Sequence, residues 1–205
     1  YRVRGGDYIA RDYDIEPDVS AACYFYALAA ATGKWAMVKR MRKESLQGDM
    51  KFIKLLEKMG CTVSWERDGR QNLWLKGPDG KLKGMEVKMS DFSDQALTLA
   101  AIAPFADSEV TITGIAHIRG QESDRIKVIV DELAKMGILC NELSDGVKIH
   151  PGTPKNTNIE TYNDHRVAMS FAVTGLAGDG MTILNPMCCK KTFAGFFDEI
   201  DRLEE

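Results

Sequence analysis

An internal repeat constrains the fold of this chain more than any other feature. The stretch SLQGDMKFIKLLEKMG at 45–60 aligns without a gap with ESDRIKVIVDELAKMG at 122–137, and both end in Lys-Met-Gly. Upstream of each stretch, an acidic residue precedes a long apolar run: Asp18 before VSAACYFYALAAA and Asp94 before QALTLAAIAPFA. A repeat of this length indicates that the chain is built from copies of one supersecondary unit.

A third, shortened copy follows the first two. Asp164 opens the apolar stretch HRVAMSFAVTGLA, and KTFAGFFDEIDRLEE supplies a closing amphipathic segment. We therefore expect a single domain over 1–205, made of three units at approximately 1–80, 81–155 and 156–205, with the last unit truncated.

The first helix of each unit is apolar on nearly all sides, and a helix of that kind is expected to be buried on all faces. We expect these helices to begin near Val19, Gln95 and His165, to run side by side, and to have their N-terminal ends on one face of the domain.

The second helix of each unit is amphipathic. Apolar residues share one face along 52–59 and again along 126–136, whereas charged residues between them face outward. Each pattern stops at a glycine, Gly60 or Gly137, which is a suitable C-terminal cap. Between and after the helices, short β-branched or alternating runs predict strands. These runs are CTVSWE, NLWLKG, EVTITGI, GVKIHP and MTILNP.

Each unit is thus expected to contain a strand, a buried helix, a strand, a surface helix and a hairpin, which is a βαβαββ arrangement. Three such units around a pseudo-threefold axis predict an α/β (α+β) fold in which sheets surround the buried helices. Asp18, Asp94 and Asp164 then stand at the N-terminal ends of those helices. Three converging N-termini favour an anion site, while the simpler interpretation is that each Asp only caps its helix, worth about 1 kcal/mol.

Composition excludes several classes of function. The net charge is −3, so we expect no general basic surface for nucleic acid or anionic membranes. There is no run of 18 apolar residues, which argues against a membrane span.

The five cysteines are odd in number and lack C-x-x-C spacing, which argues against a disulfide framework and favours a reducing cytoplasm. His117, His150 and His165 show no ligand spacing, so we expect no metal. Because the chain begins at Tyr1 rather than at methionine, we expect part of the natural protein to precede it.

Four stretches together resemble the family of 5-enolpyruvylshikimate-3-phosphate synthases, the shikimate-pathway enzymes that bind glyphosate. They are YNDHRVAMSF, RGQESDRI, CCKKTF and PDVSAACYF. The family's enzymes have two pseudo-threefold domains of three βαβαββ-type units each, with the active site between them. The resemblance covers the C-terminal half, so it implies that the N-terminal partner domain is absent from this chain.

The resemblance implies an enolpyruvyl transferase. The reaction transfers the enolpyruvyl group of phosphoenolpyruvate to the 5-hydroxyl of shikimate 3-phosphate and releases phosphate, a step toward the aromatic amino acids. The implied partners are these two substrates and the N-terminal domain of the same protein, and no cofactor is implied. We expect this half alone to be inactive, because the other domain carries about half of the binding groups.

The matching motifs also imply roles for individual residues. Asp94 is expected to act as the base for the reacting hydroxyl, and Glu122 as the acid that protonates C3 of phosphoenolpyruvate. Four residues are expected to bind phosphoenolpyruvate: Arg125, Arg166, Lys191 and His165.

The resemblance assigns three residues to shikimate 3-phosphate, namely Asp94, His117 and Gln121. Two of them depart from the family pattern, which usually has asparagine in place of His117 and lysine in place of Gln121. A lost charged hydrogen bond is worth roughly 1.5–3 kcal/mol if buried. Affinity for the shikimate substrate and tolerance of glyphosate are therefore open at this stage.

Physical chemistry supports these roles independently. Phosphoenolpyruvate carries a carboxylate and a phosphate, and guanidinium groups bind such oxygens with two parallel hydrogen bonds. Two carboxylates in different environments can divide the proton transfers. Taken alone, each stretch has a simpler structural interpretation: Glu122 and Arg125 at a solvated helix start, and His165 as a satisfied polar side chain. Their joint occurrence, in the right order, favours the functional interpretation.

Two other classes remain alternatives. A UDP-N-acetylglucosamine enolpyruvyl transferase shares the fold and chemistry, although the YNDHR stretch disfavours it. An RNA 3′-terminal phosphate cyclase-like domain uses related repeat units, but the acidic net charge and the lack of a basic, aromatic-lined stripe argue against it.

Overall fold

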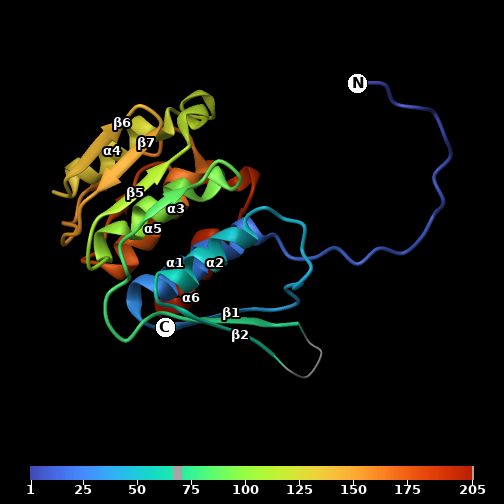
Figure 1. Cartoon of the computed structure of the whole chain (residues 1–205), viewed down its shortest axis with the longest axis horizontal. Coiled ribbons are helices and arrows are strands. Elements are labelled where there is room, and N and C mark those ends of the chain that lie inside the picture. The colour runs from blue at the N-terminus through green and yellow to red at the C-terminus, as the bar shows by residue number, and fades with distance from the viewer. Residues whose placement is uncertain (67–70, 205) are drawn as a thin grey trace.

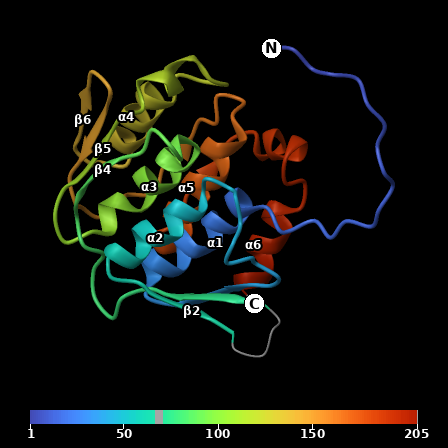
Figure 2. The ribbon, with the colours of Figure 1, turned by 45° about the vertical axis from the view of Figure 1, so that its right-hand side comes forward.

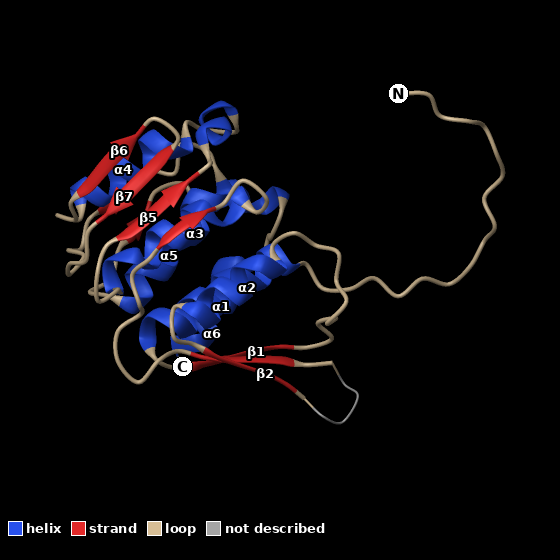
Figure 3. Ribbon diagram, viewed as in Figure 1, coloured by secondary structure: helices blue, strands red, loops and turns tan. Residues whose placement is uncertain are grey.

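The strands in the described residues form three separate sheets, and each sheet lies within one of the predicted units. Strands of the first two sheets are drawn in red in Figure 3. The structure is a computed structural model that describes residues 1–66 and 71–204. The first sheet has the order β1-β3-β2, the second β4-β5-β7-β6 and the third β8-β9. The strands are β1 (Trp35–Val38), β2 (Thr62–Trp65), β3 (Leu73–Lys76), β4 (Glu86–Lys88), β5 (Val110–Thr113), β6 (Cys140–Leu143), β7 (Gly146–Ile149), β8 (Asn158–Ile159) and β9 (Thr182–Ile183).

The buried helix of each unit begins where the sequence predicts. The three are α1 (Val19–Thr32), α3 (Ala96–Ile102) and α5 (His165–Ala177), and a 3-10 turn over Ser93–Gln95 leads into α3. The three helices contact one another and lie side by side in the interior (Figure 2). The prediction of three adjacent helices that begin at these positions is therefore confirmed.

The surface helices and their stops also follow the sequence pattern. They are α2 (Met50–Lys58), α4 (Arg125–Lys135) and α6 (Phe196–Glu204). Gly60 and Gly137 follow α2 and α4 with φ of 108° and 76°, a conformation that a glycine adopts without strain. Within residues 1–66 and 71–204, none of the helices combines the length and the apolar character that crossing a bilayer requires.

The middle unit is a complete βαβαββ unit, β4-α3-β5-α4-β6-β7, in which β4 pairs parallel with β5. Within the described residues, the third unit contains β8-α5-β9-α6. The opening strand expected in the first unit is absent, because 1–18 contain neither helix nor strand and extend away from the domain (Figure 1). Asp14 ties this segment to the domain through Arg40 and Arg42, but an exposed ion pair of that kind contributes little.

One expectation about burial is wrong for α1. Phe25 and Leu28 are only partly buried and line a groove of 1290 Å³, whose other walls include β1, β9 and α6. The described residues therefore leave α1 incompletely covered on the side that faces β1, β9 and α6.

Candidate active site

The N-terminal ends of α3, α4 and α5 meet through a network of ionised side chains. At its centre is Asp164, whose side chain is 0% exposed. It caps α5 by accepting a hydrogen bond of 2.9 Å from the backbone N–H of Arg166. It also accepts from Arg125 Nε at 2.8 Å and from Ser123 Oγ at 3.0 Å. Burial raises the pKa of Asp164, but the hydrogen bond and charge of Arg125 outweigh burial and leave the pKa below its ordinary value.

Asp94 connects both arginines and is the most accessible carboxylate of the network, with 43% of its side chain exposed. Arg166 Nη2 lies 2.8 Å from Asp94 Oδ2, and Arg125 Nη1 lies 3.5 Å from Asp94 Oδ1. In the part of the chain that the structure describes, the side chain of Asp94 caps no helix. Asp94 is thus held between two guanidinium groups, and the simple cap interpretation fails for it.

Arg166 is largely buried and keeps its charge. Burial lowers its pKa, but the neighbouring Tyr24, Asp94 and Asp49 raise it by more, so the pKa ends above its ordinary value. A guanidinium group that is surrounded by acidic partners in a sheltered position is ready to exchange one of them for an anionic ligand.

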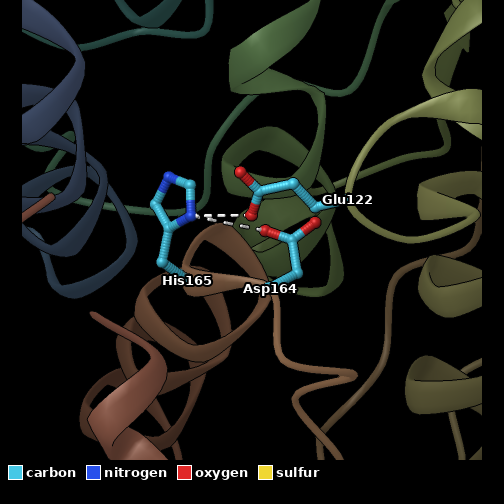
Figure 4. Close-up of side chains that lie close together, drawn as sticks. All are labelled: Glu122, Asp164 and His165. Carbon is cyan, nitrogen blue, oxygen red and sulfur yellow. Dashed lines mark hydrogen bonds and ion pairs between the residues drawn. The ribbon is translucent and has the colours of Figure 1, made fainter. Parts of the chain in front are cut away.

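Glu122 stands between His165 and Lys191. His165 Nδ1 lies 3.0 Å from Glu122 Oε2, and Lys191 Nζ lies 2.6 Å from Glu122 Oε1. Figure 4 shows Glu122 and Asp164 pointing toward the same edge of the His165 ring. Burial raises the pKa of Glu122, yet Lys191 and His165 lower it by more, so its pKa lies below the ordinary value. Burial lowers the pKa of His165, and the charge of Glu122 only partly compensates.

The two departures from the family pattern lie beside the same network. His117 Nε2 is 2.8 Å from the hydroxyl of Ser93, one residue before Asp94. Gln121 accepts a hydrogen bond from Arg125 through its side-chain oxygen. The eight residues named from the sequence therefore come from five separate stretches and gather at one place.

Glu122, Asp164 and His165 also have the geometry of a candidate metal site, since one ligand atom from each lies within 4.8 Å of the others. Their oxygens, however, already accept from Arg125, Ser123 and Lys191. Fixed cations at this distance oppose a further positive charge. The arrangement suits an anion better than a metal ion.

The sequence profile of the family described as EPSP synthase (3-phosphoshikimate 1-carboxyvinyltransferase) matches residues 1–200. The chain belongs to the EPSP synthase family. It is 44% identical over its whole length to the 3-phosphoshikimate 1-carboxyvinyltransferase of Nostoc punctiforme, of which it covers 47%. It is 41% identical over 98% of its length to that of Methanoculleus marisnigri, again covering 47% of the relative. The chain thus spans about half the length of these EPSP synthase family members.

Solved structures agree with this family. An EPSP synthase from Acinetobacter baumannii superposes with a TM-score of 0.78 and 28% identity, covering 92% of this chain and 46% of its own. The enolpyruvyl transferase NikO from Streptomyces tendae has a TM-score of 0.69 at 17% identity, which supports the fold alone. Neither alternative family raised by the sequence is favoured by these matches to EPSP synthases.

Sequence reasoning about this member of the EPSP synthase family missed several residues of the network. The sequence places Asp164 at the start of a buried helix beside a possible anion site, but it does not predict that Asp164 anchors Arg125. Its position directly before an apolar helix and beside two ionisable residues was a usable signal, because a carboxylate entering a buried segment needs a partner. Asp49 and Gln95, which lie beside the network, gave no signal in the sequence.

Proposed function

We propose that this chain forms the C-terminal domain of an enzyme that transfers the enolpyruvyl group of phosphoenolpyruvate to the 5-hydroxyl of shikimate 3-phosphate, with release of phosphate. One observation carries the proposal. In a member of the EPSP synthase family, three cations and two accessible carboxylates form one network at the N-terminal ends of three helices. Such a site offers both anion binding and proton transfer.

The cations bind phosphoenolpyruvate in this proposal. Arg125, Arg166 and Lys191 exchange their present carboxylate partners for the carboxylate and phosphate oxygens of the substrate, and His165 lies beside them. Guanidinium groups are suited to this exchange because they form two parallel hydrogen bonds with either kind of ligand group. His117 and Gln121, which are near Asp94, face the shikimate substrate.

The carboxylates carry the proton transfers. Asp94 takes the proton from the 5-hydroxyl as the hydroxyl oxygen attacks C2 of phosphoenolpyruvate, and Glu122 gives a proton to C3. Glu122, now a carboxylate, then takes back one C3 proton as the bond between C2 and the phosphate oxygen breaks, which restores the double bond and releases phosphate. When the substrate binds Lys191, Glu122 loses the partner that most lowers its pKa, while burial continues to raise that pKa. Substrate binding therefore favours the protonated form that an acid needs.

The rest of the protein supplies the opposite wall of the site in this proposal. The relatives are about twice as long as this chain, and the groove beside β1 and β9 offers apolar surface on which further residues can pack. A cleft needs both walls to exclude water. We therefore expect the chain alone to release phosphate only at background rate. The five free thiols, all within the described residues, are consistent with the cytoplasm as its location.

The test is a phosphate-release assay on the whole protein with both substrates. We expect turnover with shikimate 3-phosphate and none with UDP-N-acetylglucosamine. Glu122→Gln is expected to lower kcat by about 10²–10⁴-fold with much smaller changes in substrate affinity. Arg166→Ala is expected to cost about 2–5 kcal/mol in substrate binding or transition-state stabilisation. A folded whole protein without turnover, or normal turnover in Glu122→Gln, would contradict the proposal.

A further inference from the structure

Asp49 is a buried carboxylate that joins two of the buried helices. Its residue is 8% exposed and lies at the start of α2. One oxygen, Oδ2, accepts from the hydroxyl of Ser20 in the first turn of α1 at 2.5 Å. The same oxygen accepts from Nε2 of Gln95 at 2.6 Å, in the turn that leads into α3. A single atom thus fixes the separation between the N-terminal ends of two helices from different repeat units.

The usual structural roles of such a residue do not account for it. Although Asp49 occupies the N-cap position of α2, its side chain caps nothing among the residues with described positions. The ion pairs found within residues 1–66 and 71–204 include none of Asp49 either. A carboxylate that is buried against two neutral donors costs more than a neutral amide would in the same place. The side chain of Asp49 therefore contributes an acceptor oxygen to Ser20 and Gln95 rather than a cap or an ion pair.

What Asp49 holds is the backbone next to Asp94. Gln95 follows Asp94 directly, is 0% exposed, and contacts Asp49 through its amide nitrogen. Its side-chain oxygen has no hydrogen-bond partner in the described part of the chain, so the contact with Asp49 is what orients this side chain. Asp94 is itself paired with Arg166, and the charge of Asp49 reaches Arg166 closely enough to raise the pKa of that guanidinium.

We propose that Asp49 is a positioning residue, which acts through Gln95 to hold Asp94 opposite Arg166 for proton transfer. The inference rests on the proposed function, because the position of Asp94 affects turnover only if Asp94 takes part in a reaction. A misplacement of about 1 Å at a reacting group can lower the rate by about 10²-fold. A residue that sets the distance between Asp94 and Arg166 without contacting the substrate therefore affects kcat more than substrate affinity.

The test uses the whole protein and three variants. Asp49→Asn keeps an oxygen that can accept from both Ser20 and Gln95, so we expect kcat within about threefold of wild type. The double variant Asp49→Leu/Gln95→Leu replaces the two buried polar partners by apolar groups of similar shape, which is often nearly neutral for stability, and the third partner, Ser20, is only partly buried and can bond to water. We expect it to fold and to lose roughly 10–10²-fold in kcat while KM for both substrates stays within about threefold. Asp18→Ala removes the cap of the backbone N–H of Ser20 but leaves both side chains of the Ser20–Asp49 contact in place. It is therefore the control for a general weakening of the start of α1 and should keep wild-type kcat.

The outcomes separate this inference from the proposed function. Wild-type kcat in the folded double variant, or an equal loss in Asp18→Ala, would overturn the positioning role. A kcat loss in Asp49→Asn as large as in the double variant would also overturn it. If the wild-type protein itself shows no turnover, the proposed function fails, and a crystal structure of the double variant still decides the matter. In that structure the Asp94–Arg166 contact should be longer than its present 2.8 Å, and an unchanged contact would overturn the inference.

Discussion

Asp18 and Asp164 open equivalent helices of the repeat, yet they have different surroundings. Asp18 is exposed and accepts from the backbone N–H groups of Ser20 and Ala21, which is the behaviour of an ordinary helix cap. Asp164 caps its helix too, but it is fully buried and anchors Arg125. The third equivalent residue, Asp94, caps nothing in the described chain and is held by two arginines.

The difference shows that the repeat determines where each carboxylate lies, whereas the neighbouring units determine what it contacts. Arg125 and Arg166 come from the second and third units and meet Asp94 and Asp164. In the described residues, no comparable cation pairs with Asp18. One position in a repeat thus carries a cap, an anchor for a cation and a candidate base.

The largest effect is expected at Asp94. In the whole protein, Asp94→Asn keeps the size of the side chain but removes the base, so kcat should fall by about 10²–10⁴-fold. The melting temperature should fall less than in an Asp164→Ala variant, because Asn keeps an oxygen that can accept from Arg166 and no capping hydrogen bond is lost. Steady-state kinetics beside a melting curve checks both statements. A stability loss with unchanged turnover would mean that Asp94, like Asp18, only stabilises the fold.

Asp164 should give the largest effect on stability. Asp164→Ala removes the cap of α5 and leaves Arg125, whose side chain is 4% exposed, without its main partner. Breaking a buried pair in this way costs about 3–5 kcal/mol. Urea unfolding of the variant measures the cost, with Asp164→Asn as the matched variant that keeps the capping oxygen. A loss of only about 1 kcal/mol, as expected for a simple cap, would contradict the anchor role.

A substitution of Asp18 should have a smaller effect, and it should affect stability alone. Asp18→Ala removes two backbone hydrogen bonds at the start of α1 and should lower the free energy of unfolding by about 1 kcal/mol. Turnover of the folded fraction should not change. Asp18→Asn, which keeps a capping oxygen, should recover most of the stability. Reduced kcat in Asp18→Ala would mean that all three aspartates contribute to the site.

The smallest effect concerns pH and His165. Burial lowers its pKa in the folded protein below the ordinary value of 6.5. The unfolded chain therefore binds a proton more readily, so the contribution to stability is complete above about pH 6.5 and is lost as the pH falls toward the folded pKa. Unfolding measured from pH 7.5 to 5 should show this loss in wild type and less of it in His165→Gln. An identical pH dependence in the two proteins would mean that groups other than His165 cause the loss of stability at low pH.

The sequence predicted the helices better than the strands. The apolar runs after Asp18, Asp94 and Asp164 correctly indicated α1, α3 and α5, because a helix with an extended apolar pattern is specified locally. The predicted strand segments also contain strands, but β1, β4, β6 and β8 were not named in advance. Each of these four strands contains at most one β-branched residue, so its sequence carries little strand signal. The absence of a strand before α1 could not be predicted, because a strand forms only where another strand, distant in the sequence, pairs with it.

The sequence by itself determined the repeat and the helices that follow Asp18, Asp94 and Asp164, and its motifs carried the family resemblance that assigned the eight site residues. It could do so because spacing within one element, and motifs within one stretch, are properties of neighbouring residues. Only the tertiary structure decided that Asp164 anchors Arg125, that Asp94 pairs with Arg166, and that Asp49 ties two helices together. These contacts join residues that are 29 to 72 positions apart, and Coulomb and hydrogen-bond energies depend on distances that only the packing of the three units sets.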